Sequence, residues 1–141
     1  MSFKGYPSKY YSRFSFIAIC GQSIINLSTQ ETVNLTSPNY PEEYFNNINC
    51  VWHFYATDTT DGVFHLQIRE FDLNYNWYST DFLTIGGGSE DNVVASLESH
   101  SPDTVTVSGT VLRVHFQTDE RGTGTGFLLL IQRISDKQLG R

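Results

Sequence analysis

Apolar and polar side chains alternate along two stretches of this chain, and this two-residue period constrains the fold more than any other feature. Residues 63–69 and 111–117 carry an apolar side chain at every second position, from Phe64 and Leu112 onward. Such a period is typical of strands that bury one face and leave the other in water. No segment shows a sustained helical period, so the sequence predicts an all-β protein.

Turn residues separate further short strands along the chain. Weaker strands are expected at 32–36, 51–56, 81–85, 92–97, 104–107 and 126–134. Asp61-Gly62 lies between two apolar runs, which predicts a hairpin at that point. Several strands of this length, at this spacing, predict an antiparallel β-sandwich.

The composition narrows the classes of function. The chain has 141 residues, of which 39% are hydrophobic and 14% aromatic, enough for one domain with its own core. Its formal net charge is −6 and it has no run of lysine or arginine, so it lacks the clustered cations of a nucleic-acid surface. No stretch approaches the roughly 20 apolar residues of a membrane span. A basic partner is electrostatically favoured.

The two ends of the chain differ from its middle. Lys4, Lys9 and Arg13 precede a short apolar run at 14–19, which is the order of a secretory signal. The run is short for a signal sequence, so residues 1–19 are interpreted either as a weak signal-like segment or as a leader outside the domain. We expect the domain itself at 20–134 and a polar tail at 135–141.

Two features bear on the compartment of the chain. Cys20 and Cys50 are its only cysteines, an even count that suits one disulfide without requiring it. Glycosylation sequons begin at Asn26 and Asn34, which makes both side chains candidates for N-linked glycans. A disulfide and glycans are both found in secreted proteins.

Five short motifs, taken in order along the chain, resemble the CUB domain family. They are Cys20-Gly21, Ser37-Pro38-Asn39-Tyr40-Pro41 with Tyr44, Cys50-Val51-Trp52, the stretch 70–73 with 81–85, and the stretch 112–119 with 124–127. Their order and spacing cover residues 20–134. The resemblance implies a jelly-roll-like β-sandwich in a secreted protein or an ectodomain, with a role in binding an extracellular protein.

The resemblance also implies a disulfide between Cys20 and Cys50. Many members of the family carry a second disulfide, whose cysteines would fall near Tyr78 and Glu98 in this chain. Both cysteines are absent here as a pair. Packing then has to provide the stabilisation that such a bridge contributes.

A calcium site between the loops is a further implication of the resemblance. The family's carboxylates match Asp81 and Asp119, and its supporting tyrosine matches Tyr44. The third position, usually glutamate, falls on Asn74, which offers one neutral oxygen in place of two charged ones. Calcium takes six to eight oxygen ligands, so we expect a weak calcium site at most. Alternatively, the two aspartates cap turns or bond to loop amides.

The resemblance gives the binding mode as well. In calcium-dependent CUB interactions a basic side chain of the partner, often lysine, contacts the acidic ligands, and we expect the same here. An alternative is a carbohydrate-binding β-sandwich that uses Tyr75 and Trp77 against sugar rings. Another is the non-catalytic part of a larger secreted protease.

No catalytic arrangement is visible in the sequence. The histidines are scattered and there is no Gly-x-Ser-x-Gly elbow. The glycine-rich stretch 122–126 lacks the Lys-Ser/Thr of a phosphate loop and is interpreted as a flexible turn. We therefore expect a binding module rather than an enzyme.

Overall fold

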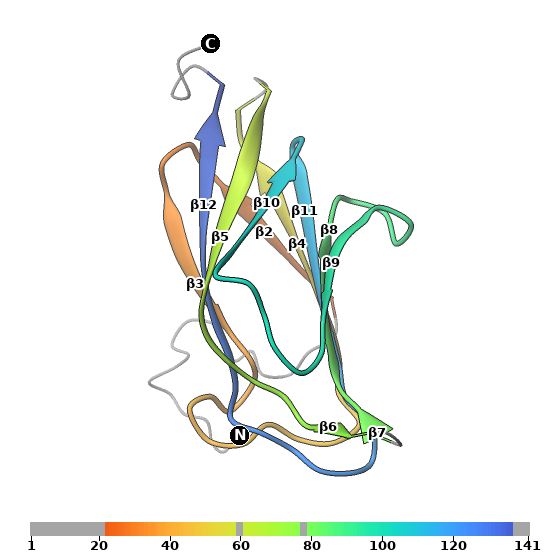
Figure 1. Cartoon of the computed structure of the whole chain (residues 1–141). Helices are drawn as coiled ribbons and strands as arrows, with labels where there is room; N and C mark the ends of the chain where they lie inside the picture. Colours follow the sequence, from red (N-terminus) through yellow and green to blue (C-terminus); the bar gives the residue numbers. More distant parts are fainter. Residues whose placement is uncertain (1–21, 59–60, 77–78, 137–141) are drawn as a thin grey trace.

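The computed structural model describes residues 22–58, 61–76 and 79–136, which form two sheets packed face to face (Figure 1). One sheet has the order β10 (Thr104–Ser108), β5 (Gly62–Asp72), β12 (Gly126–Ser135) and β3 (Thr32–Thr36). The other has the order β2 (Gln22–Leu27), β4 (Asn49–Ala56), β11 (Val111–Gln117), β8 (Phe82–Gly86) and β9 (Val93–Leu97). Two short strands, β6 (Tyr75–Asn76) and β7 (Ser79–Thr80), pair with each other. No helix occurs in the described residues, and the predicted all-β sandwich is confirmed.

The alternation in the sequence is the alternation of burial in the structure. Phe64 and Leu66 of β5 and Leu112, Val114 and Phe116 of β11 are all completely buried. These side chains lie between the two sheets, where the hydrophobic core is formed. The polar residues between them point to the outer faces.

Aromatic rings connect this core to one end of the sandwich. Trp52 of β4 and Phe127 of β12 pack edge to face with their centroids 6.1 Å apart. Phe127 contacts Phe116 in the same way at 5.1 Å, and Phe116 contacts Tyr44 at 5.1 Å. Tyr44 belongs to the loop between β3 and β4, so this row of rings fixes that loop on the core.

The predicted hairpin at Asp61-Gly62 is wrong. β4 pairs with β2 and β11, whereas β5 pairs with β10 and β12, so the chain crosses between the sheets after β4. Gly62 is needed for close packing instead, because a Cβ there would lie 2.4 Å from the carbonyl oxygen of Ile134. The glycine marks contact with β12 rather than a two-residue turn.

The sequence did not predict β2 or the two short strands β6 and β7, and the direction of β2 departs from the predicted antiparallel arrangement. β2 runs parallel to β4, with Ile24 opposite His53. Ile25 and Leu27 pack on the core, but apolar Ile24 lies on the outer face and is 71% exposed, so apolar and polar residues do not alternate in this strand. Among the described strands, β2 lies at the edge of its sheet, where an apolar side chain can stay exposed. The sequence pattern therefore did not identify it as a strand.

Among the described residues, no helix is long and apolar enough to cross a membrane. The expected leader 1–19 lies outside the described residues, as does most of the expected tail.

Candidate functional site

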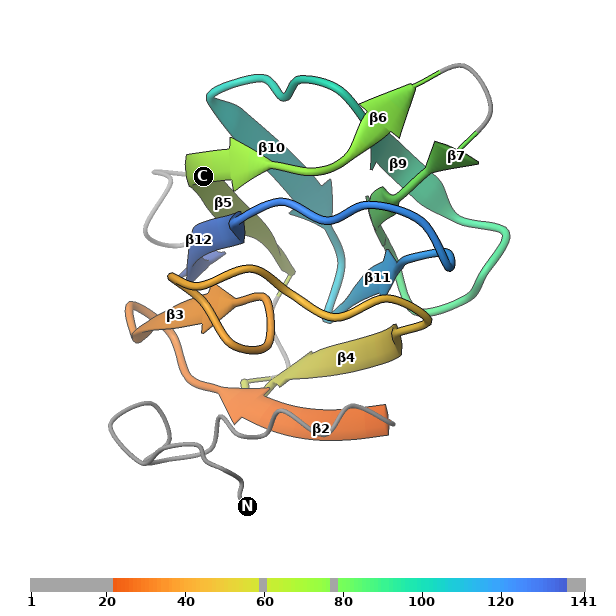
Figure 2. The ribbon, with the colours of Figure 1, turned by 90° about the horizontal axis from the view of Figure 1, so that it is seen from below.

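Three loops lie side by side across one end of the sandwich (Figure 2). They are the β3–β4 loop (37–48), the β5–β6 loop (73–74) and the β11–β12 loop (118–125), with the β11–β12 loop between the other two. We refer to this surface as the loop end. Tyr44, Asn74 and Asp119 come from one loop each, and Asp81 directly precedes β8.

Tyr44 and Asp81 form the buried centre of the loop end. The Tyr44 hydroxyl donates a hydrogen bond to Asp81 Oδ2 at 2.5 Å and accepts one from the Asn74 N–H at 2.8 Å. The Asp81 N–H donates to the Asn74 carbonyl at 3.2 Å. Tyr44 is 2% exposed and Asp81 is completely buried. The structure therefore brings three of the four predicted site residues into direct contact.

Asp119 joins this group through its backbone. Its N–H donates to Asp81 Oδ1 at 3.0 Å, so each carboxylate oxygen of Asp81 accepts a hydrogen bond from a different loop. The Asp119 Oδ1 accepts from the Arg121 N–H at 3.0 Å, and the charge of this carboxylate also raises the pKa of the Asp81 carboxyl. A bond of this kind, from an aspartate to the backbone two residues on, stabilises a turn.

The Asn74 side chain ties two loops together. Its Nδ2 donates to the Arg121 carbonyl at 3.2 Å. Gly122 allows this contact, since a Cβ there would lie 2.7 Å from the Asn74 amide group. Gly122 also has φ +72°, a conformation that glycine adopts readily.

The glycine-rich stretch interpreted as a flexible turn is bonded on both flanks. On the β3–β4 side, the Tyr44 N–H donates to the Gly124 carbonyl at 3.1 Å. On the β5 side, Asp72 Oδ2 accepts from the Thr125 N–H at 2.9 Å. Buried Thr118 adds a hydrogen bond from its hydroxyl to the Phe45 carbonyl at 3.0 Å. The sequence did not predict these hydrogen bonds. Their only signal in the sequence was the high density of Gly and Thr in this loop.

Burial dominates the electrostatics of the central pair. Removal from water raises the pKa of the Asp81 carboxyl, although the hydrogen bonds from Tyr44 and from the Asp119 N–H act in the opposite direction. Burial likewise raises the pKa of the Tyr44 hydroxyl, so this group is a donor throughout the physiological range.

The residues present do not fit a calcium ion. Of the four predicted site residues, Asp81 and Asp119 supply carboxylates, and both oxygens of Asp81 already accept hydrogen bonds in a fully buried position. The Asn74 amide contributes its donor, not its oxygen, to the contact with Arg121. In the part of the chain that the structure describes, no group of three or more Asp, Glu, His and Cys side chains could hold a metal ion. Calcium needs more oxygen ligands than this arrangement offers.

The other predicted residues lie elsewhere. Cys50 is buried and bonded in a disulfide, but Cys20 lies outside the described residues, so the pairing stays a prediction. Asn26 on β2 and Asn34 on β3 are both exposed. Tyr75 beside the loop end is 51% exposed. Trp77 lies outside the described residues.

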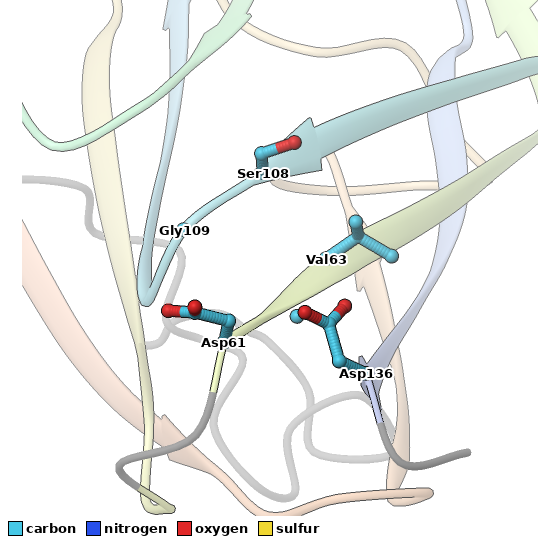
Figure 3. A pocket seen from close by; sticks show the side chains of 6 residues that line it. Asp61, Val63, Ser108, Gly109 and Asp136 are labelled. Carbon is cyan, nitrogen blue, oxygen red and sulfur yellow. The ribbon is translucent and has the colours of Figure 1, made fainter. Parts of the chain in front are cut away.

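A shallow pocket of about 330 Å³ lies at the opposite end of β5 from the loop end (Figure 3). Its lining is Asp61, Gly62, Val63, Ser108, Gly109 and Asp136. Asp61 and Asp136 both line it, and the Asp136 N–H donates to the Asp61 carbonyl at 2.8 Å. Two carboxylates on an open surface do not make a catalytic or metal site.

Comparison with known proteins assigns the family. The sequence profile of the CUB domain matches residues 20–130. The chain belongs to the CUB domain family. Rat Neuropilin-2 is 31% identical over 111 residues, which are 73% of this chain and only 12% of that protein. This chain therefore corresponds to a small part of that relative.

Solved CUB structures have the same fold. The CUB1-EGF-CUB2 domains of rat MASP-1 superpose with a TM-score of 0.65 at 19% identity, over 79% of this chain and 42% of theirs. The MASP-1 CUB2 domain bound to Ca2+ gives a TM-score of 0.60 at 23% identity, over 76% of this chain and 96% of that one. At these identities the likeness concerns the fold of this CUB domain.

Proposed function

We propose that this CUB domain is a non-enzymatic extracellular module that binds a protein partner through its loop end. The observation that carries the proposal is the convergence of three sequence-distant loops on the buried Tyr44–Asp81 pair. Loops fixed on a rigid sandwich are the usual carriers of recognition. Phe45 and Tyr75 add exposed aromatic surface there, at 55% and 51%, and aromatic residues are enriched in protein interfaces.

The charge of the loop end supports a basic group on the partner. Glu42, Glu43 and Glu120 are its exposed acidic side chains, and exposed Glu70 and Asp72 lie beside it at the end of β5. Arg121 pairs with Glu120 at 3.8 Å, which leaves the surface negative. A lysine or arginine of a partner is attracted to such a surface.

An extracellular location is supported by the disulfide at Cys50 and by the exposed sequon asparagines Asn26 and Asn34. The absence of enzymatic activity is an expectation from the family resemblance. An assay of the isolated chain against peptide substrates should detect no hydrolysis. We expect this result even if the natural protein carries a protease domain beside this one, because that activity would belong to the neighbouring domain.

The proposal can be tested on an array of purified extracellular domains. We expect the full chain to bind at least one of them, and the charge reversal Glu120→Lys to weaken this binding at least tenfold. Asp91→Lys is the matched control, because Asp91 is an exposed acid in the turn after β8, away from the loop end. Equal binding by both variants would place the interface elsewhere.

Calcium-dependent recognition is the alternative form of this proposal. It is favoured by the likeness to the MASP-1 CUB2 domain bound to Ca2+. The small number of oxygen ligands around Asp81 argues against a calcium ion at this position. Binding of the partner in EDTA and in calcium distinguishes the two forms, since only the alternative loses the complex in EDTA.

Carbohydrate binding is a second candidate function, favoured by the exposed ring of Tyr75. A flat aromatic ring at a loop can stack on a sugar. Binding to a glycan array that is lost in Trp77→Ala would support it and would replace the protein partner in our account.

A further inference from the structure

We propose that the loop end is held together by a hydrogen-bonded clamp that needs no metal ion, with Asn74 as its positioning residue. The clamp consists of Tyr44, Asn74, Asp81, Asp119 and the backbone of Arg121. The clamp implies that partner binding is independent of calcium, and this implication rests on the proposed function. The existence of the clamp does not rest on the proposed function.

Every loop bonds to Asp81, and two of the three bond to its carboxylate. The β3–β4 loop contacts Asp81 through the Tyr44 hydroxyl, and the β11–β12 loop contacts it through the Asp119 N–H. The β5–β6 loop bonds to the backbone of Asp81 and to the Tyr44 hydroxyl. Hydrogen bonds to a buried carboxylate are stronger than neutral ones. These contacts join all three loops without any additional group.

The chemistry of residue 74 also favours a clamp without a metal ion. An amide can donate a hydrogen bond, and Asn74 Nδ2 does so to the Arg121 carbonyl. A carboxylate accepts only, so Asp or Glu at this position would lose the bond and would add a third negative charge beside Asp81 and Asp119. The asparagine therefore suits a closed clamp, whereas a carboxylate would suit a cation.

The backbone next to Asn74 is shaped for the amide side chain. Gly122 packs against the Asn74 side chain so closely that a Cβ would approach its three terminal atoms to 2.7 Å. The Asn47 N–H holds the same loop from the other side through the Asp119 carbonyl at 3.0 Å. The β11–β12 loop is thus fixed on both sides of the clamp.

The test compares unfolding and amide exchange of the full chain in EDTA and in calcium. In Asn74→Ala and Asn74→Asp, we expect the rate of amide exchange in 119–124 to rise about fivefold. A rise of this size corresponds to the loss of one net hydrogen bond. Asn46→Asp adds the same charge at an exposed position in the β3–β4 loop and should exchange as the wild type does. The unfolding midpoint of the wild type should be the same in EDTA and in calcium of about 5 mM, the range of weak extracellular sites.

Two results would overturn the proposal. One is a wild-type midpoint that rises with calcium, because the loops would then need an ion. The other is unchanged exchange in both Asn74 variants, because the amide would then position nothing. Neither result depends on whether Glu120→Lys weakens partner binding, so the clamp and the proposed function can fail separately.

Discussion

At the residue scale, the Tyr44 hydroxyl joins two segments of the loop end. It satisfies one oxygen of buried Asp81 and the N–H of Asn74 at the same time. Tyr44→Phe removes both contacts and leaves these polar groups buried without that partner. We expect a loss of about 1–3 kcal/mol in the free energy of unfolding, measured by urea denaturation.

Tyr40→Phe is the control for this variant. The Tyr40 hydroxyl donates to the Glu70 carboxylate at an exposed position. Water can replace that contact, so we expect a cost below about 1 kcal/mol. Equal losses in both variants would mean that the central pair contributes no more than a surface contact.

His115 gives a pH-dependent contribution on the outer face of β11. Burial, and then the charge of Arg113, lower its pKa, while Glu90 acts in the opposite direction. A lowered pKa in the folded state means that the stability contributed above the unfolded value of about 6.5 is lost as pH falls through the folded value. His115→Gln keeps a donor for Asn49 Oδ1 and removes this titration.

We therefore expect the wild type to lose stability relative to His115→Gln between about pH 7.5 and about pH 5. Urea denaturation of both proteins at each pH measures the difference. A difference that stays constant across this range, or moves in favour of the wild type, would show that His115 protonates as easily in the folded protein as in the unfolded chain.

At the element scale, the two strands with sequons are both edge strands within the part of the chain that the structure describes. β2 is the last strand of one sheet and β3 the last of the other, and four residues connect them. Glycans on exposed Asn26 and Asn34 would cover both open edges, which otherwise can pair with another chain. We expect the chain secreted from mammalian cells to lose the mass of one glycan in Asn26→Gln and of another in Asn34→Gln. A secreted chain of unmodified mass would contradict this.

The strands themselves were predictable to different degrees. β3 and β11 have the predicted bounds, because their alternation matches the side chains they bury. β2 was missed because an edge strand can expose Ile24 without a large penalty. The hairpin at Asp61-Gly62 was wrong because a short connection can also join two different sheets, and local turn residues do not distinguish these cases.

The loop end shows the same limit. The grouping of Tyr44, Asn74, Asp81 and Asp119 was anticipated from the family resemblance, and the structure places them together. The atoms that make the contacts were not predictable. Whether Asp119 offers its carboxylate or its N–H to Asp81 depends on the path of the β11–β12 loop, which local sequence does not fix.

At the scale of the whole molecule, the described residues are strongly acidic. All 15 acidic residues of the chain lie in the described ranges. The basic residues of those ranges are Arg69, Arg113, Arg121 and Arg133. Repulsion among like charges destabilises a compact state, and salt screens it.

We therefore expect the thermal midpoint of the full chain to rise by a few degrees when sodium chloride is raised to about 0.3 M. Differential scanning calorimetry measures this change. A midpoint that falls with salt would mean that ion pairs such as Arg113–Glu90 outweigh the overall repulsion.

A crystal structure of the domain grown in calcium chloride tests the central claim most directly, namely that the loop end is assembled by its own hydrogen bonds. Our account predicts that Asp81 keeps its bonds to Tyr44 and Asp119, that Asn74 keeps its bond to Arg121, and that no ion lies among them. An ion bonded to Asp81 and Asp119 at the usual calcium distance of about 2.3–2.6 Å would contradict it.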